Sequence, residues 1–358
     1  MANINTNIQG LTALRVLFML MIFVHHCNFS YGGGSCAVAG FFIMSGFCMT
    51  LGYREKVLRD DFSWSKFMIR RAIKLYPIHW VGLLLMWILS GCYFHLGPKF
   101  IGTLSLNAAL LQSWIPNKSV YFSYNSPSWY LCDILFFAAL FPFLMRLISN
   151  SSRIVKCAIL IIPLISIIVL SLMLPQEIRH AWLYIHPIAR LVDCLLGMYA
   201  AMLFMAIRDN ASYVRKIDKH ILLIDAGIVL MSIVVIIQSI YRYQVGFAQL
   251  YHTIFWIPEL LLILFVSLRS LSKEQSLIQS LLNCRVIEYI GACSLSFYIL
   301  HIPMMTALGR IYPACMPNAN SIIGGSIAFF ATIIVSRISY QLIEKSLTKY
   351  LNCKLIKQ

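Results

Sequence analysis

The chain has little charge, and acidic side chains are the scarcest. Only 12% of its 358 residues are charged, and 13 acids stand against 29 lysines and arginines. A soluble domain carries about 25% charged residues, so this chain has about half the usual share. Apolar residues make up 60% of the chain, and the mean hydropathy is +0.78. These proportions exclude disordered and ordinary soluble proteins, and they indicate a chain that crosses a membrane several times.

The signatures of familiar soluble chemistries and of metal sites are missing. The 11 cysteines are scattered singly, mostly in apolar runs and without a C-x-x-C pair, which argues against a zinc site or a disulfide framework. No Walker A, G-x-G-x-x-G, H-E-x-x-H or G-x-S-x-G sequence occurs. Residues 1–9 carry no charge, so the first apolar run lacks the cationic start of a signal peptide. We therefore expect buried cysteines, no metal, and a first span that is retained.

Long apolar runs dominate the sequence. A helix needs about 20 largely apolar residues to cross about 30 Å of hydrocarbon. Residues 100–115 are shorter and contain Asn107 and Gln112, so they form either an interfacial or re-entrant piece or an eleventh span. The sequence predicts an all-α polytopic membrane bundle of about 10 (10–11) transmembrane helices, with residues 1–358 as a single membrane domain and no appended soluble domain. The ten expected spans are 11–29, 36–53, 76–95, 129–146, 157–175, 182–207, 221–241, 249–268, 287–308 and 321–343.

Lysine and arginine are distributed unevenly between the two sets of loops. With ten spans and an inside N-terminus, the inside loops and tail hold 21 of them and the outside loops hold five. Cytoplasmic loops carry the excess of basic residues, so both termini are expected in the cytoplasm and the protein in the inner (plasma) membrane. The net charge of +16 then describes a cytoplasmic surface, and no nucleic-acid partner is expected.

Ionisable side chains inside the expected spans are candidates for function, because such charges rarely occur in hydrocarbon without a role. Arg15 and His26 are 11 residues apart, which brings them within about 20° of the same helix face and about 16 Å apart along the axis. His25 lies about 80° away from that face. A histidine near the outer end can act as a general base toward a hydroxyl. The alternative is that His25 and His26 only sit at the membrane interface.

Two further groups of charges have both a structural and a functional interpretation. Arg190 and Asp193 are spaced to pair on one helix, which favours a structural ion pair. The expected cytoplasmic loop 54–74 ends in RRAIK, where Arg71 and Lys74 face one side and Arg70 lies beside them. This arrangement suits a phosphorylated ligand such as a nucleotide or coenzyme A. Anchoring by positive charge on the inner side would produce the same pattern.

Three sequence blocks near the N-terminus resemble the acyltransferase-3 family of membrane acyltransferases. LTALRVLFMLMIFVHH is similar to its first-span signature, in which a basic residue is followed after ten positions by histidine, matching Arg15 and His26. AGFFIMSGF resembles its FFxxSGF motif and carries Ser45. FMIRRAIKLYP resembles its R-x-x-R-x-x-P stretch, with Arg71 matching the first arginine and Lys74 replacing the second.

Four later blocks extend the resemblance in the same order over residues 11–347. SPSWYLCDILFF resembles the block around Trp129, and IARLVDCLLGMYAA resembles an Arg-x-x-Asp/Glu-x-x-x-Gly block. SLSFYILHIP is similar to a Ser-x-x-Tyr-x-x-His-x-Pro block that carries Tyr298 and His301, and YQLIEKSL resembles the closing block with Glu344. A soluble domain often follows the last span in this family, and we expect none here, because only about 15 residues follow the last expected span. Lys74 departs from the pattern, and an ammonium is a point donor without the two-pronged geometry of arginine.

The resemblance implies transfer of an acyl group, usually acetyl, from cytoplasmic acetyl-CoA or another acyl-CoA. The acceptor it implies is a hydroxyl of a cell-surface or lipid-linked glycan on the outer side. It further implies that His26 is the base or the acyl carrier with Arg15 as its partner, and that Arg71, Lys74 and Arg70 contact the donor. Ser45, Trp129, Tyr298, His301 and Glu344 are additional candidates, although Ser45 also fits as a small packing residue and His301 as a satisfied interior histidine.

Two other functions are compatible with a polytopic membrane protein. A secondary transporter or exporter of a polysaccharide precursor would use intramembrane Asp and Glu as proton relays. No convincing internal repeat of the kind found in many transporters is visible in the sequence. A scaffold within a polysaccharide-synthesis complex is the third option.

Overall fold

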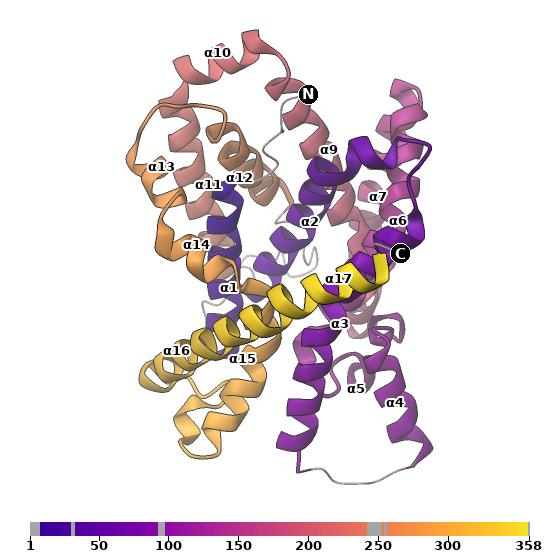
Figure 1. Ribbon diagram of the computed structural model, residues 1–358, viewed down its shortest axis with the longest axis vertical. Helices are drawn as coiled ribbons and strands as arrows, with labels where there is room; N and C mark the ends of the chain where they lie inside the picture. Colours follow the sequence, from indigo (N-terminus) through magenta and orange to yellow (C-terminus); the bar gives the residue numbers. More distant parts are fainter. Residues whose placement is uncertain (1–7, 30–32, 92–96, 242–252, 254–255, 357–358) are drawn as a thin grey trace.

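The computed structural model describes residues 8–29, 33–91, 97–241, 253 and 256–356, and in these residues it contains helices and no strands (Figure 1). This confirms the predicted all-α membrane bundle. The helices are α1 (Gln9–His26), α2 (Gly34–Val57), α3 (Trp64–Leu89), α4 (Pro98–Ala108), α5 (Lys118–Tyr121), α6 (Trp129–Asn150), α7 (Arg153–Met173), α8 (Gln176–Arg179), α9 (Pro187–Arg208), α10 (Ala211–Lys219), α11 (Ile221–Tyr241), α12 (Trp256–Arg269), α13 (Leu277–Leu282), α14 (Arg285–Gly291), α15 (Ser294–Gly309), α16 (Ile322–Ser339) and α17 (Thr348–Ile356), with π-helical segments η3 (His180–Ile185) and η6 (Tyr340–Leu347) and short 3₁₀ turns η1 (Gln112–Trp114), η2 (Ser126–Ser128) and η5 (Pro313–Cys315).

Each of the ten expected spans contains a helix, but not every helix is long enough to cross a bilayer. Within the described residues, seven helices have the length and hydropathy for a span, and α14 with α15, bent by 66°, forms an eighth if it counts as one. The helix α1 is slightly short, and α12 has 14 residues. Residues 249–252 and 254–255 of the expected eighth span lie outside the described residues. The number ten therefore stays a prediction.

Residues 100–115 do not form an eleventh span. The helix α4 ends at Ala108, and its 11 residues cover about 16 Å, roughly half of the hydrocarbon thickness. The chain then turns through Leu110, whose φ of 56° is in the left-handed region, and continues into η1. This segment and α5 lie at the lower end of the molecule in Figure 1.

The loop expected to reach residue 74 ends much earlier. The helix α3 begins at Trp64, because the Ser63 hydroxyl caps its first turn by accepting a hydrogen bond from the Lys66 amide at 3.3 Å. Lys74 and its basic neighbours therefore lie on the first turns of α3, and the helix continues through Pro77. These turns are too polar for an apolar-run criterion to include them, so the sequence analysis placed the helix start too late.

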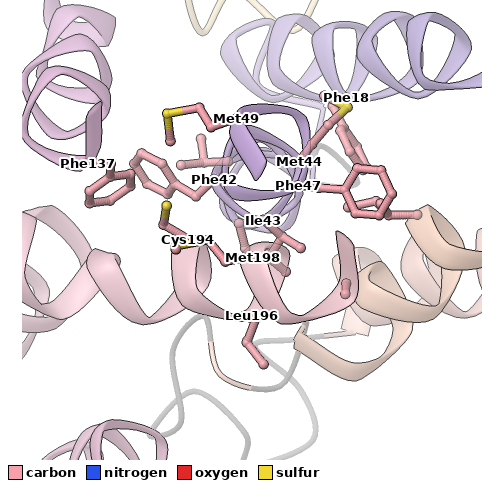
Figure 2. Packing of buried hydrophobic residues seen from close by; sticks show 14 of the residues in the cluster. Phe18, Phe42, Ile43, Met44, Phe47, Met49, Phe137, Cys194, Leu196 and Met198 are labelled. Atoms are coloured by element: carbon pink, nitrogen blue, oxygen red, sulfur yellow. The ribbon is translucent and has the colours of Figure 1, made fainter. Parts of the chain in front are cut away.

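The helix α2 is the centre of the bundle. It packs against α1, α6, α9 and α12, and 78% of its apolar window is buried, compared with 11% for the peripheral α7. Figure 2 shows its side chains spreading toward the surrounding helices, with Phe42 close to Phe137 and Ile43 close to Met198. A helix that is apolar on all sides belongs in the interior.

Two glycines set the distance between α2 and α9. A Cβ added to Gly46 would lie 2.0 Å from the carbonyl oxygen of Cys194, and one added to Gly197 would lie 1.8 Å from the carbonyl oxygen of Ile43. Both obstacles are backbone atoms, which cannot rotate away. The close approach therefore requires glycine at both positions and explains why Gly46 and Gly197 occur within the motif blocks.

Two buried arginines, Arg190 on α9 and Arg269 on α12, are paired with carboxylates. Arg190 and Asp193, predicted from their spacing, form an ion pair of 3.0 Å in which both side chains are fully buried. The indole N–H of Trp256 on α12 donates to Asp193, which ties α12 to α9. Arg269 on α12 donates to Asp225 on α11 at 2.8 Å. These two arginines are matched with carboxylates because an unpaired buried charge would be strongly destabilising.

The glycine contact leads to a testable contrast between two substitutions on the same helix. Gly46→Ala should destabilise the protein by about 1–3 kcal/mol, because the added methyl forces α2 and α9 apart. Gly52→Ala, where no atom lies within 4 Å of the added Cβ, should have no such effect. The measurement is the thermal unfolding of the detergent-solubilised variants. A Gly46→Ala protein that unfolds at the wild-type temperature or above would contradict this account.

Candidate active site

A cavity of about 300 Å³ lies between α1, α2, α3, α6, α14, α15 and η6. It gathers three of the predicted site cations, Arg15, Arg71 and Lys74, with a single carboxylate, Glu344. These residues come from helices far apart in the sequence. With three cations and one carboxylate, the cavity carries an excess of positive charge that suits an anionic ligand.

Aromatic rings hold Arg71 in the cavity wall. Its guanidinium lies 4.9 Å from the ring centroid of Tyr53 and 4.9 Å from that of Phe67. Within the described part of the chain, its Nε has no hydrogen-bond partner, and no carboxylate pairs with the group. Cation–π contacts orient the guanidinium without occupying its N–H donors. These donors therefore remain available to a ligand.

The other cations of the cavity are close to one another. Lys74 lies one turn of α3 after Arg71 and is exposed to solvent. Its electrostatic neighbours include Arg15, Arg71 and Glu344. Arg15 donates to the Cys48 sulfur at 3.8 Å. Among the described residues, neither Arg15 nor Lys74 forms a salt bridge with a carboxylate. Clustered cations without carboxylate partners are typical of phosphate-binding sites.

Glu344 occupies a fixed position in the wall of the cavity. It lies on the π-helical segment η6 and accepts hydrogen bonds from the Ser296 amide at 3.0 Å and from the Ser296 hydroxyl at 2.5 Å. These bonds connect η6 to the start of α15. Single-turn π segments occur often at functional sites. Glu344 thus contributes the one negative charge opposite the three cations.

Three predicted site residues have different surroundings. Ser45 lines the cavity, with its hydroxyl donating to the Phe41 carbonyl at 2.8 Å. Arg70 is exposed and does not line the cavity. Trp129 is buried and packs on Phe42 with ring centroids 6.1 Å apart, outside the cavity lining. The structure therefore brings Ser45 into the site but places Arg70 and Trp129 outside it.

Two histidines meet beyond the cavity. His26 is the last residue of α1, and its Nδ1 lies 3.3 Å from Nε2 of His301 on α15. The two are separated by 275 positions in the sequence. His25, next to His26, is exposed. The structure thus pairs His26 with His301 and leaves His25 at the surface.

Backbone carbonyls determine which ring nitrogens carry protons. Nδ1 of His26 lies 2.9 Å from the Ile22 carbonyl, and Nδ1 of His301 lies 2.7 Å from the Tyr298 carbonyl. A carbonyl oxygen only accepts, so we assign a proton to each Nδ1. Nε2 of neutral His301 then presents a lone pair to the N–H of His26. This leaves Nε2 of His26 as a free base, held in orientation by two acceptors on the opposite nitrogen.

Arg15 and His26 share a helix but not an immediate environment. Arg15 lines the cavity, whereas His26 does not. The expected separation of about 16 Å along α1 is consistent with this placement. The side chain within hydrogen-bonding distance of His26 is that of His301. The predicted partnership between Arg15 and His26 therefore involves no contact, and Arg15 lies with the basic groups of the cavity.

The sequence analysis did not single out Cys48, Tyr53 or Tyr130, which also line the cavity. Cys48 lies one helical turn after Ser45 on α2, and Tyr53 lies two turns after Ser45. Continuing the helical spacing from the quoted FFxxSGF block would have identified both. Tyr130 follows Trp129 directly, but no pattern in the sequence distinguishes which of the two faces the cavity.

The described residues contain no group of three or more His, Cys, Asp or Glu side chains arranged to hold a metal ion. None of the ten cysteines in the described part of the chain forms a disulfide. Cys92 lies outside the described residues.

Comparison with known proteins identifies the family. Peptidoglycan O-acetyltransferase OatA of Listeria monocytogenes is 24% identical over 362 aligned residues, covering 96% of this chain and 56% of that protein. Acyltransferase MdmB of Streptomyces mycarofaciens is 33% identical over 124 residues, covering 33% of this chain and 30% of that protein. The chain thus spans about half the length of the first relative. No solved structure matches the chain significantly. The family model described as acyltransferase domain, Acyl_transf_3, matches residues 8–340, and the chain therefore belongs to the acyltransferase-3 family.

Proposed function

We propose that this membrane protein is an O-acyltransferase that moves an acyl group, acetyl in the first instance, from acyl-CoA to a hydroxyl of a glycan. The observation that carries the proposal is the arrangement of two sites along α1 and α15. Along these two helices, Arg15 and Tyr298 line a basic cavity, and the His26–His301 pair lies beyond that cavity. Membership in the acyltransferase-3 family favours acyl transfer over transport.

The donor binds through its phosphates. Arg71 and Lys74, with Arg15 nearby, supply cationic N–H donors in one cavity. Phosphate groups accept such charge-assisted hydrogen bonds, which are about twice as strong as neutral ones. Cytoplasmic acyl-CoA presents several phosphates and a thioester at the far end of a long arm. The arm would direct the thioester toward the histidine end of the cavity.

His26 acts on the acceptor. Its free Nε2 takes the proton from the acceptor hydroxyl, and the oxygen attacks the thioester carbonyl carbon. A C–O bond forms, the C–S bond breaks, and the thiolate of coenzyme A leaves and takes up a proton, so that atoms and charge balance. The lone pair of His301 stabilises the imidazolium that forms on His26 during the transfer. An acidic residue has this role in Ser-His-Asp catalytic triads.

The family and the distribution of charge support a proposal for the acceptor class and for the cellular location. The Listeria relative is named for acetylation of peptidoglycan, and we propose an envelope or lipid-linked glycan as acceptor here. The basic helix α10, with Arg215, Lys216 and Lys219, lies at the opposite end of the molecule from α4 and α5 (Figure 1). We assign the α10 end to the cytoplasm and both termini to that side of the inner membrane. We also propose that residues 1–358 act as a single membrane domain.

The two adjacent histidines allow a matched test of the catalytic base. His26→Gln should lower glycan acylation by about 10²–10⁴-fold, because it removes the base while preserving a side chain of similar size. His25→Gln, one residue away and exposed, should retain activity. The measurement is mass spectrometry of alkali-labile acyl groups on the surface glycans of cells that accumulate equal amounts of each protein. Full acylation by His26→Gln cells would remove His26 from the mechanism.

The basic residues of α3 allow a second matched test, this time of donor binding. Replacing both Arg71 and Lys74 by alanine should raise KM for acyl-CoA by about tenfold or more, since each loses a charge-assisted hydrogen bond of about 1.5–3 kcal/mol. Arg70→Ala should change KM much less, because Arg70 does not line the cavity. Initial rates in membrane vesicles at several donor concentrations give the values. Equal KM values for the double variant and the wild type would refute the assignment.

A further inference from the structure

Three aromatic rings close the end of the cavity that faces the histidines. They are Phe41 on α2, Tyr130 on α6 and Tyr298 on α15. The ring centroids are 6.1 Å apart for Phe41 and Tyr130, 6.5 Å for Phe41 and Tyr298, and 5.1 Å for Tyr130 and Tyr298. Rings at these separations are in contact, and the three form a closed triangle. We name this set the ring triangle.

The ring triangle occupies the same level on each of its three helices. On α15 the lining residues end at Tyr298, and His301 follows one turn later. On α6 the lining begins at Tyr130, the second residue of the helix. On α2, which runs in the opposite direction to α15, Phe41 is the lining residue closest to the helix start. Each ring is therefore the last cavity residue before the histidine level.

Neighbouring side chains hold the ring triangle in place. The Tyr298 hydroxyl donates to the Pro127 carbonyl at 3.0 Å, and its ring lies 6.0 Å from the ring of His301. Phe18, which lies on α1 between Arg15 and His26, packs edge-on against Phe41 at 5.5 Å. His26 and His301 do not line the cavity. The described rings thus separate the basic cavity from the histidine pair.

We infer that the ring triangle is the acyl-size filter of the enzyme and restricts transfer to two-carbon acyl groups. This inference rests on the proposed function, in which the thioester end of the donor must reach His26 from the cavity. An acetyl group needs only a small displacement of the rings. Each further methylene requires a larger displacement of side chains that are packed at close to crystal density.

The rest of the cavity is not selective against longer chains. On α6, the residues that line the cavity after Tyr130 are Leu131, Ile134 and Ala138, and all three are apolar. Such a wall accepts an aliphatic chain as readily as a methyl group. Discrimination therefore falls to the ring triangle, which the acyl carbon must pass, and not to the volume in which the donor arm lies.

The experiment compares two donors in one preparation. Inside-out membrane vesicles from cells that express the full chain carry the cells' own glycan acceptor, and they receive labelled acetyl-CoA or butyryl-CoA on the cytoplasmic face. Alkali-labile label on vesicle glycan gives the ratio of butyryl to acetyl transfer. Phe41→Ala should raise this ratio by about tenfold or more, because discrimination of a single methylene by a packed site is worth at least that factor. Phe41→Leu, a milder change, should raise it less.

Ile134→Ala is the matched control, since it enlarges the cavity without opening the ring triangle. It should leave the ratio close to that of the wild type. An unchanged ratio in both Phe41 variants, with acetyl transfer retained, would overturn the filter but leave the proposed function intact. An equal rise in Ile134→Ala would also overturn the filter, because cavity volume would then set acyl size. Wild-type vesicles that transfer no acetyl would overturn the proposed function and the filter together.

Discussion

The high free energy of placing charge in hydrocarbon organises this molecule. An ionised side chain at the centre of a bilayer costs about 2.5–3.5 kcal/mol on insertion scales, so each one needs a partner or a purpose. Arg190 and Arg269 have partners, the carboxylates of Asp193 and Asp225. Arg71 and Lys74 pair with no carboxylate in the described chain and instead face a cavity. The cations that pair with carboxylates therefore belong to the structural scaffold, and the cations without carboxylate partners belong to the candidate site.

The scaffold keeps the candidate site in place by using two sides of α2 for different purposes. One side meets α9 so closely that Gly46 and Gly197 leave no space for a Cβ. An adjoining side presents Phe41, Ser45 and further residues to the cavity. Because the glycine contact fixes α2 against α9, the cavity side of α2 is fixed against α1, α6 and α15. Packing on one side of the helix therefore determines the spacing of the rings and cations on the other side.

Much of this fold could be predicted from the sequence because hydropathy is a local signal. All ten expected spans contain helices, and the pairing of Arg190 with Asp193 followed from a spacing of three residues. The start of α3 was misplaced because its first turns are polar and are set by the Ser63 cap. The contact between His26 and His301 joins residues 275 positions apart, and no local pattern encodes such a distance.

The candidate site was predicted in part for the same reason. Helical periodicity correctly placed Arg15 and His26 on one helix, with His25 on a different face, but it could not show that Arg15 belongs with the cations of α3. Motif resemblance identified Tyr298, His301 and Glu344 as candidates without indicating their partners. The ring triangle depends on three helices meeting at one level, which is a property of the tertiary packing alone. Helical periodicity in the sequence thus predicts which residues share one face of a helix. The tertiary structure is needed to show which other helices that face contacts.

The separation of the cations from the histidines also suits the energetics of the proposed reaction. Binding energy from groups remote from the reacting carbon can be used to distort or displace what obstructs the reaction. In the proposed complex, the donor phosphates would contact Arg71 and Lys74, which line the same cavity as Phe41 and Tyr298 but lie on α3, away from the thioester. That binding energy is then available to displace the rings as the acyl group moves toward His26. If the ring triangle opens only when the donor phosphates are bound, it would keep the two sides of the membrane separate between turnovers. It would still allow the acyl group to pass during each turnover.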